Sequence, residues 1–381
     1  MGKLADIITR FEPPLKRKRA LSAQQCKVFG SVKACRTSRL GASVQTVCAC
    51  GNEIVAYNSC RDRHCPQCQG RATRKWVAAQ SERLLPTRYH HCVFTLPDTL
   101  DELVRYNEAA IYDLLFAASS GTLKSFFASD RRFGGKGGFF GVLHTWGQRL
   151  QLHPHVHYVV ACGSLADGVW RDGKGSLFDV KKLSKVFRGK FLKAVQRLHA
   201  KGKLTLPPGW GPGRFRGALR LSSLRPWVVY TKETYCGPDK VVEYVGRYAH
   251  KVAISEGRIR EVGEGSVTFE WKDYRQDGAK KLATVAGGDF VRMFAQHVLP
   301  AGFRRIRYYG FWNPKGLDQA RQSIKQQGLA LVDMVKALLA VAANIELRHQ
   351  EHGVRCPSCG DLAFEAETPS FHSLLDLLDS S

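Results

Sequence analysis

The pattern of apolar and polar positions divides much of the chain into alternating strands and helices. β-Branched and aromatic runs predict strands at residues 90–96, 139–146, 155–162, 227–230 and 267–271. Apolar residues at helical spacing predict helices at residues 100–115, 180–200, 239–250 and 316–350. Because strands and helices mix irregularly, we expect an α+β fold built around a central antiparallel sheet.

Charge points to the class of partner. The chain has 381 residues, with 58 lysines and arginines against 33 aspartates and glutamates, a net charge of +25. This excess indicates a polyanionic partner, nucleic acid first and an anionic membrane surface second. The sequence has no run of about 18 uncharged apolar residues, so we expect no transmembrane span. The first residues lack a signal-peptide pattern, and a cytoplasmic location is expected.

Cysteines cluster near the start of the chain, where seven lie between Cys26 and Cys68. In a reducing compartment such clustering favours zinc over disulfides. Cys65 and Cys68 form a Cys-x2-Cys turn, which supplies two tetrahedral ligands from one loop. The segment has few large apolar residues, so it would lack a core without metal. The nearest upstream partners are Cys48 and Cys50, and the substitutes are Cys35, Cys60 and His64.

A second candidate zinc site lies near the end of the chain. Its four residues are His349, His352, Cys356 and Cys359. They could form a complete set of ligands. The alternative is a lone cysteine pair beside two solvated histidines.

The strand predicted at residues 155–162 begins with two histidines on one face. Side chains alternate across a strand, so His155 and His157 point the same way and make a metal-ligand pair. The preceding strand should form a hairpin with this one, which brings either His144 or Gln148 to the same face. We favour Gln148, because a neutral amide oxygen suits a hard cation such as Mg²⁺ or Mn²⁺.

Tyr244 and Tyr248 are spaced to share one face of the helix predicted at residues 239–250. A phenol becomes a feasible nucleophile when a metal polarises the phosphate it attacks. Two tyrosines near one metal would permit two successive transfers. A tyrosine pair alone is weak evidence for nucleophiles, because amphipathic helices often bury two tyrosines. The interpretation therefore depends on the histidine pair.

Together these motifs resemble the rolling-circle transposases of the HUH class (His, apolar residue, His), the insertion sequence 91 family. The resemblance covers roughly residues 30–360 and rests on His155-Val156-His157, Tyr244 with Tyr248, and residues 59–68, 91–97, 297–310 and 356–360. One departure is Cys48-x-Cys50, where the family usually has Cys-x2-Cys.

The resemblance implies an enzyme that nicks and rejoins single-stranded DNA at hairpin-forming ends of a mobile element. A tyrosine would become linked to the 5′ phosphate, with Mg²⁺ or Mn²⁺ as catalytic metal, Zn²⁺ as structural metal and self-association as a possibility. The fold would be a sheet of the HUH nuclease type. We divide the chain into a basic arm and zinc-binding domain (1–75), the nuclease domain (76–256), a β-rich basic extension (257–315) and a mainly helical C-terminal region (316–381).

Basic residues around these motifs are candidates for binding DNA. Lys232 resembles a family position and could neutralise phosphate charge during the transfer. The tyrosine segment carries Arg247 and Lys251, which could hold the flanking backbone. Further on, Arg304, Arg305 and Arg307 alternate with aromatic rings, which fits either a groove for a single strand or an ordinary strand with core and surface positions.

Two other functional classes compete with the transposase. A zinc-containing DNA-binding regulator without catalysis would explain the charge and the cysteines, but it leaves the histidine and tyrosine pairs without a role. A replication initiator or a conjugative relaxase would use the same tyrosine chemistry, and gene context would separate it from a transposase.

Overall fold

The computed structural model describes residues 2–18, 21–46, 53–173, 177–233, 242, 246 and 252–327. All statements about structure concern these residues. Within them, no helix is both long and apolar enough to cross a bilayer.

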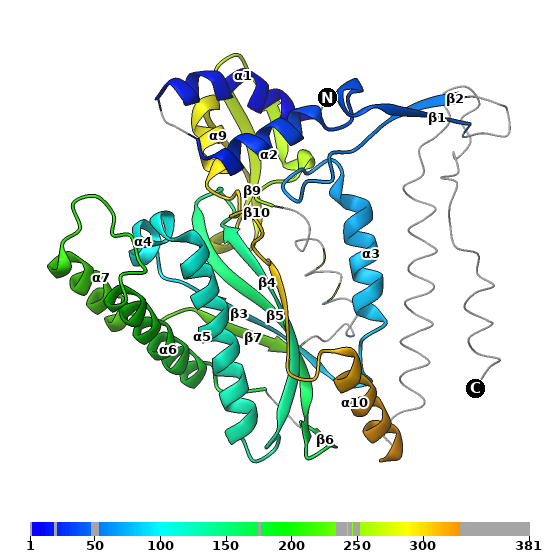
Figure 1. The fold of residues 1–381 in the computed structure, drawn as a ribbon, viewed down its shortest axis with the longest axis vertical. Helices are drawn as coiled ribbons and strands as arrows, with labels where there is room; N and C mark the ends of the chain where they lie inside the picture. The colour runs from blue at the N-terminus through cyan, green and yellow to red at the C-terminus, as the bar shows by residue number, and fades with distance from the viewer. Residues whose placement is uncertain are drawn as a thin grey trace.

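A six-stranded antiparallel sheet forms the centre of the molecule (Figure 1). Its path runs through β11 (Ile306–Tyr309), β4 (Lys136–Trp146), β5 (Leu152–Ala166), β3 (Tyr89–Thr95) and β7 (Val229–Glu233), and β6 (Val169–Asp172) pairs with the end of β5. Nearly every residue of β4 and β5 is buried. Such continuous apolar runs form where a sheet is covered on both faces.

One face of the sheet is covered by α5 (Glu108–Ser129) and α6 (Val180–Ala200), with α4 (Asp101–Tyr106) and α7 (Pro212–Leu224) packed beside them. Phe94 and Tyr158 from the sheet pack here with Phe187 of α6. This aromatic core is the larger of the two that involve the sheet.

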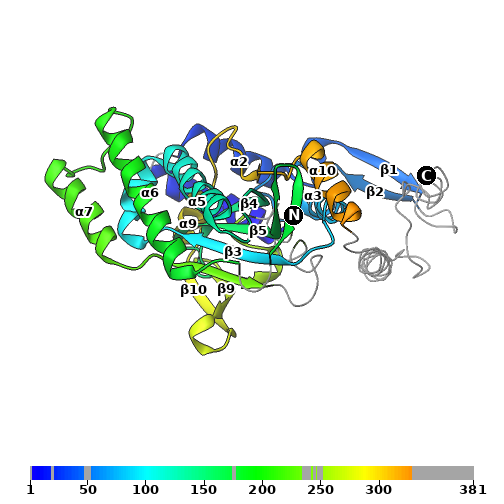
Figure 2. The same cartoon turned by 90° about the horizontal axis from the view of Figure 1, so that it is seen from below.

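The opposite face is covered by α3 (Gln69–Ser81) and α10 (Pro314–Gln326), as the two views show (Figures 1 and 2). Its core contains Phe140 and Val159 of the sheet, Trp312 before α10, and Val242. Because side chains alternate along β5, His155 and His157 lie on this second face. We call it the histidine face.

A separate layer combines the N-terminal helices with residues 259–295. Helices α1 (Lys3–Lys18), α2 (Ala23–Ala34) and α9 (Gly287–Ala295) share a core with the sheet β8 (Ile259–Val262), β9 (Ser266–Asp273) and β10 (Ala279–Ala286). The hairpin β1 (Ala42–Thr46) and β2 (Glu53–Tyr57) follows α2, and short 3₁₀ turns occupy Ser38–Leu40, Asp98–Leu100, Glu256–Arg258 and Tyr274–Gln276. Pro13 lies within α1, so the basic start of the chain is helical up to Lys18. The reason is that Ile7, Ile8 and Leu15 bury one side of this helix.

The expected fold class is confirmed: the protein is α+β, with a central antiparallel sheet flanked by helices. Every strand predicted from the apolar pattern is present, within a few residues. Most of the helix predicted at 239–250 lies outside the described residues, although Val242 and Gly246 are helical. The helix predicted at 316–350 is described only as α10, and the four domain boundaries stay predictions.

Candidate functional site

Three histidines meet on the histidine face, where β4 and β5 pair. His144 of β4 stands directly opposite His155 of β5, and His157 is two residues further along. Their ring centroids lie 4.2 Å (His144–His157), 4.8 Å (His155–His157) and 5.2 Å (His144–His155) apart. One nitrogen from each ring lies within 4.8 Å of the others. Three side chains from two paired strands therefore converge on one point.

The surroundings keep these imidazoles neutral, which is the form that binds a metal. Burial lowers the pKa of His155 to about 3. Burial, together with the neighbouring histidines, lowers the pKa of His144 and of His157 well below the usual range. At neutral pH the group presents lone pairs rather than positive charges, so its donor chemistry fits a divalent cation.

Two hydrogen bonds orient the rings of β5. Nδ1 of His155 lies 2.6 Å from the carbonyl oxygen of His153 and donates to it, which leaves Nε2 as the free acceptor. Nδ1 of His157 lies 2.7 Å from Nε2 of His91 on β3. Burial lowers the pKa of His91 to about 4, so this ring is also neutral. Sequence reasoning placed no site residue at His91, because only the pairing of β3 with β5 brings it to His157.

Gln148, which the sequence favoured as the third ligand, points elsewhere. The strand β4 ends at Trp146, and the register shifts between His144 and Trp146, so Gln148 falls in the turn after the strand. Its side-chain oxygen accepts from the backbone N–H of Lys272 at 3.4 Å, and its amide nitrogen lies 3.5 Å from the hydroxyl of Tyr274. His144, the alternative, occupies the position beside the histidine pair.

Lys232 stands on the edge strand β7, two strands from β5. Its partner across the ladder is His91, so both side chains project from the histidine face. Tyr230, two residues earlier, packs its ring edge against His91 at 6.2 Å between centroids. The lysine is exposed. The register therefore supports the expectation that the positively charged Lys232 side chain stands beside the histidines.

Tyr244, Tyr248, Arg247 and Lys251 lie outside the described residues. Two neighbours in sequence, Val242 and Gly246, are described and pack on the histidine face. Val242 is fully buried among the residues of that core. A Cβ atom on Gly246 would lie 2.2 Å from Cγ2 of Val77 and 3.5 Å from the Trp76 ring. This segment therefore contacts α3 closely at its one glycine.

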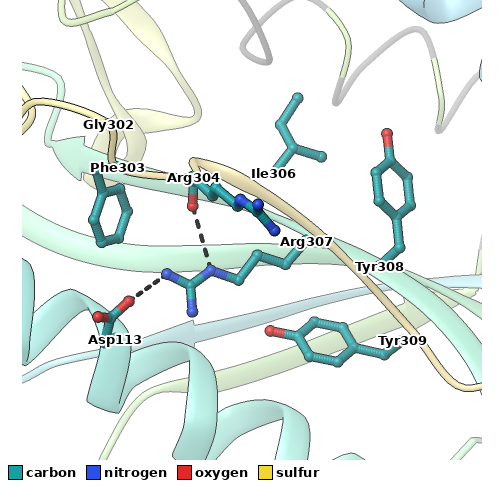
Figure 3. Close-up of a pocket in the computed structure, with 8 residues that line it drawn as sticks. All are labelled: Asp113, Gly302, Phe303, Arg304, Ile306, Arg307, Tyr308 and Tyr309. Carbon is teal, nitrogen blue, oxygen red and sulfur yellow. Dashed lines mark hydrogen bonds and ion pairs between the residues drawn. The ribbon is translucent and has the colours of Figure 1, made fainter.

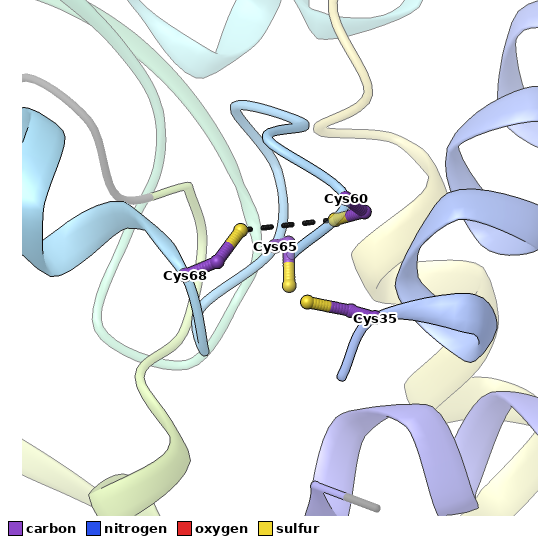
Figure 4. Close-up of side chains that lie close together, drawn as sticks. All are labelled: Cys35, Cys60, Cys65 and Cys68. Atoms are coloured by element: carbon purple, nitrogen blue, oxygen red, sulfur yellow. Dashed lines mark hydrogen bonds between the residues drawn. The ribbon is translucent and has the colours of Figure 1, made fainter. Parts of the chain in front are cut away.

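Four cysteine thiols converge between α2 and α3 (Figure 4). Cys35 caps the end of α2, whereas Cys60, Cys65 and Cys68 come from the loop that leads into α3. Sγ of Cys60 lies 3.7 Å from Sγ of Cys68. Hydrogen bonds from the thiols of Cys60 and Cys65 lower the pKa of Cys68 far below its usual range. Four convergent sulfurs, one of them favoured as thiolate, form a donor set that fits structural zinc.

The partners of Cys65 and Cys68 in this cluster are thus Cys35 and Cys60, two of the expected substitutes. Cys48 and Cys50, the pair favoured by proximity in sequence, lie outside the described residues, as do the C-terminal candidates His349, His352, Cys356 and Cys359.

His64 is not one of the converging side chains; its hydrogen bonds join two parts of the fold instead. Its Nδ1 lies 2.8 Å from the carboxylate of Asp62, and its Nε2 accepts the backbone N–H of Leu299 at 3.1 Å. Nearby, Arg63 donates to the carbonyl oxygen of Phe303. These bonds fasten the cysteine loop to the segment that leads into β11.

The three arginines predicted to bind DNA have different surroundings. Arg305 is 5% exposed, with its guanidinium over the Trp146 ring and a hydrogen bond to the Leu143 carbonyl, so its predicted DNA contact is wrong. Arg307 pairs with Asp113 and is partly buried (Figure 3). Arg304 is exposed. The strand alternation that the sequence left open as an alternative thus removes one of the three from solvent.

A shallow groove runs along this segment, lined by Asp113 and residues 302–304 and 306–309 (Figure 3). Tyr308 is 40% exposed at its edge. The Tyr308 hydroxyl accepts a hydrogen bond from the Trp76 indole at 3.2 Å, and the Arg83 guanidinium lies over its ring. Exposed rings beside arginines are the combination that binds single strands.

Comparison with known proteins decides the family. Residues 7–96 match the family model described as "Transposase zinc-binding domain", and residues 138–320 match the model described as "Putative transposase". The chain is 43% identical to "Putative transposase y4qJ" of Sinorhizobium fredii over 325 residues, which covers 83% of this chain and 82% of the relative. It is 33% identical to "Transposase for insertion sequence element IS801" of Pseudomonas savastanoi pv. phaseolicola, over 73% of this chain and 68% of the relative. The chain belongs to the insertion sequence 91 family of transposases.

Among solved structures, the transposase is similar to the conjugative relaxase TrwC in complex with oriT DNA. The two share 12% sequence identity over 42% of this chain and 70% of that chain, with a TM-score of 0.22.

The zinc-binding domain of this transposase gives a direct test of its ligands. Serine in place of Cys35 or of Cys60 is expected to remove one zinc per chain and to lower the unfolding temperature, because the metal loses a thiolate. Serine in place of Cys48 or of Cys50 should leave the zinc content unchanged. Elemental mass spectrometry of the purified variants measures both. Loss of zinc in the Cys48 and Cys50 variants alone would assign the site to the other pair.

Proposed function

We propose that this transposase nicks and rejoins single-stranded DNA by attack of a tyrosine on a phosphate held at the histidine face. The observation that carries the proposal is the group His144, His155 and His157, three neutral imidazoles at one point of the sheet. Lys232 projects from the same face. A DNA-binding regulator without catalysis would need neither feature.

In the proposed step, the phenol oxygen of Tyr244 or Tyr248 forms a bond with phosphorus while the bond from phosphorus to the 3′ oxygen breaks. The phenol proton passes to solvent, and the 3′ oxygen leaves as a hydroxyl after taking up a proton. The number of phosphoester bonds does not change, so the 5′ phosphotyrosine keeps the capacity to rejoin a strand. Lys232 would offset charge on the phosphate oxygens during the transfer.

The three histidines would hold the catalytic cation, Mn²⁺ or Mg²⁺, through one nitrogen each. When bound, this cation polarises the phosphate and stabilises the charge that develops on its oxygens. A set of imidazoles favours Mn²⁺ over Mg²⁺ more than a set with the Gln148 oxygen would. Water and the phosphate would supply the oxygen ligands.

His91 would act as a positioning residue for His157. If Nε2 of His157 binds the cation, its Nδ1 carries the proton and must donate, so Nε2 of His91 must accept. The lowered pKa of His91 supports this assignment, because a protonated His91 could not accept.

The single strand would reach the site along the groove beside Tyr308. Phosphates would meet Arg304 and Arg83, and bases would stack on Tyr308 and Trp76. Arg247 and Lys251 would hold the strand beside the nucleophile. Because the chain belongs to this family, the proposal also includes rolling-circle transfer, hairpin-forming element ends and self-association.

The tyrosine chemistry is tested with single-stranded DNA that carries the element terminus and a label at its 3′ end. The protein becomes linked to the 5′ phosphate of the downstream fragment, so a denaturing gel should show a labelled adduct with Mn²⁺ and none with EDTA. Phenylalanine at both Tyr244 and Tyr248 should lower adduct formation by more than about 10³-fold, since the nucleophile is gone.

Binding of the same DNA by the double variant should weaken by no more than about 30-fold, because each of the two lost hydroxyls removes at most one hydrogen bond of roughly 1 kcal/mol. Phenylalanine at the exposed Tyr106 serves as the matched control and should keep full activity. A metal-dependent adduct of normal yield from the double variant would refute the mechanism.

A further inference from the structure

The segment of residues 180–225, which contains α6 and α7, concentrates the positive charge of the chain. It contains thirteen lysines and arginines and no aspartate or glutamate, which accounts for about half of the net charge of +25. A solvated helix normally mixes both signs, so a run of 46 residues without a carboxylate is unusual for a surface with no partner.

Most of these side chains face solvent. Arg214 pairs with Glu102 and Arg225 with Asp98, and two others bond to oxygens of the fold. Arg188 donates to the carbonyl oxygen of Arg225, and Lys190 donates to Gly121 and Ser125. On the outer side of α6 lie Lys182, Lys185, Lys193 and Arg197, all exposed. Within the described part of the chain none of these four forms an ion pair.

The buried side of α6 explains why these four cations face solvent. Leu183, Phe187, Phe191 and Val195 are buried at helical spacing against α5 and the sheet, so the remaining side must project outward. In both views α6 and α7 lie at the end of the molecule remote from the β1–β2 hairpin, with α7 outermost (Figures 1 and 2). The basic face therefore lies on the side of the sheet opposite the histidines.

The chemistry of this face differs from that of the groove beside Tyr308. Single strands are bound by stacking of bases on exposed rings. Here the large apolar side chains that are exposed are aliphatic, Leu221 and Leu224. Phe215 is buried and stacked on His199, and the Trp210 indole is bonded to Glu102. A face that offers cations without rings fits phosphates whose bases are already paired.

The length of α6 fits the same partner. Its 21 residues span about 31 Å at ~1.5 Å per residue, close to the ~34 Å of one turn of B-form DNA. Lys182 and Arg197 stand near its two ends, so cations are available along the whole length.

We infer that the outer face of α6 and α7 binds the phosphate backbone of double-stranded DNA. The site is separate from the proposed chemistry and does not depend on it. α6 packs against β7, the edge strand whose Lys232 projects from the histidine face. The groove beside Tyr308 lies at the other edge of the sheet, on β11, so the duplex surface and the proposed single-strand groove can be tested separately.

The test uses the full chain with glutamine at Lys182, Lys185, Lys193 and Arg197. Fluorescence anisotropy measures binding of a blunt 25-base-pair duplex and of a 25-nucleotide oligo(dT) across a series of salt concentrations. Each phosphate contact contributes about 0.9 to the slope of log Kobs against log salt, so the slope for the duplex should fall by about 3 to 4. At fixed moderate salt the duplex should bind at least ~10-fold more weakly, and oligo(dT) within about threefold of wild type.

The matched control removes four exposed charges elsewhere, with glutamine at Lys272, Arg275, Lys280 and Lys325. It should keep both affinities within about threefold. A second variant, with glutamine at Arg216 and Arg220 of α7, tests the same face and should lower the duplex slope by about 2 at ~0.9 per contact. Thermal unfolding confirms that each variant is folded.

The inference fails if the α6 variant binds the duplex as wild type does, if the control loses as much, or if oligo(dT) is weakened equally. Vesicles with 30% anionic lipid provide the competing surface. Loss of vesicle binding with unchanged duplex binding would assign the face to a membrane instead. DNA cleavage is not measured, so failure of the tyrosine mechanism would leave these results unaffected.

Discussion

Alanine in place of His144 is expected to lower metal-dependent adduct formation at least about 10²-fold, whereas alanine at Gln148 should keep activity within about threefold. The physical reason is the geometry of the β4–β5 hairpin. His144 stands opposite His155 with its ring 4.2 Å from that of His157, and Gln148 bonds to the backbone of Lys272 beyond the turn. The labelled single-strand assay measures both variants.

Metal affinity provides a readout independent of DNA. Calorimetric titration of Mn²⁺ into the His144 variant should show weaker binding, with no change for the Gln148 variant. Oligo(dT) affinity in EDTA should equal that of wild type for both, because neither change affects the groove beside Tyr308. If loss of Gln148 abolishes the adduct and loss of His144 does not, the amide is the ligand and the arrangement in the structure is not the catalytic one.

Alanine at Gly246 is expected to have the second large effect, at a position that carries no chemistry. The added methyl group would lie 2.2 Å from Cγ2 of Val77. Val77 is β-branched and has few rotamers with which to move away. We expect a stability loss of about 1–3 kcal/mol from overpacking. Adduct formation should fall by about 10²-fold, because displacement of a catalytic segment by ~1 Å is enough for such a loss.

A second substitution distinguishes the effect of this steric clash from general destabilisation of the fold. Alanine at Val77 in the Gly246 variant removes the clashing methyl groups and should recover most of the adduct yield. Alanine at Gly30 of α2, where an added Cβ meets nothing within 4 Å, should leave activity unchanged. Equal activity of the Gly246 variant and wild type would contradict the prediction, because it would show that the reaction does not need close packing of Gly246 on α3.

The same helix connects the cysteine cluster with the contact to Gly246. The helix α3 begins directly after Cys68, and Val77 lies two turns further along it. Loss of zinc would release the start of α3, so we expect the serine variants of Cys35 and Cys60 to lose adduct yield together with zinc. The zinc-binding domain would thus support the reaction through a helix.

The sequence predicted the parts of the site that depend on residues close together in the chain, and it missed those that depend on contacts between distant segments. The two histidines of β5 follow from strand alternation alone, because residues two apart share a face in any strand. The choice between His144 and Gln148 depended on where β4 ends, and a bulge before Trp146 places His144 rather than Gln148 beside the pair. Arg305 looked like a DNA contact beside Arg304 and Arg307. Only the packing of the Trp146 ring over its guanidinium showed that it is buried.

The sequence by itself determined the α+β class, the central strands, the family and the residue types of the cysteine cluster and of the histidine group, because these depend on local periodicity and on spacing within one loop or strand. The tertiary structure decided which cysteines converge, which histidine lies beside the pair and that His91 lies against His157. Cys35 and Cys60 are 25 positions apart, and His91 and His157 are 66 apart. Such pairings arise from the packing of α2 against the cysteine loop and of β3 against β5, and no local pattern encodes the register between distant segments.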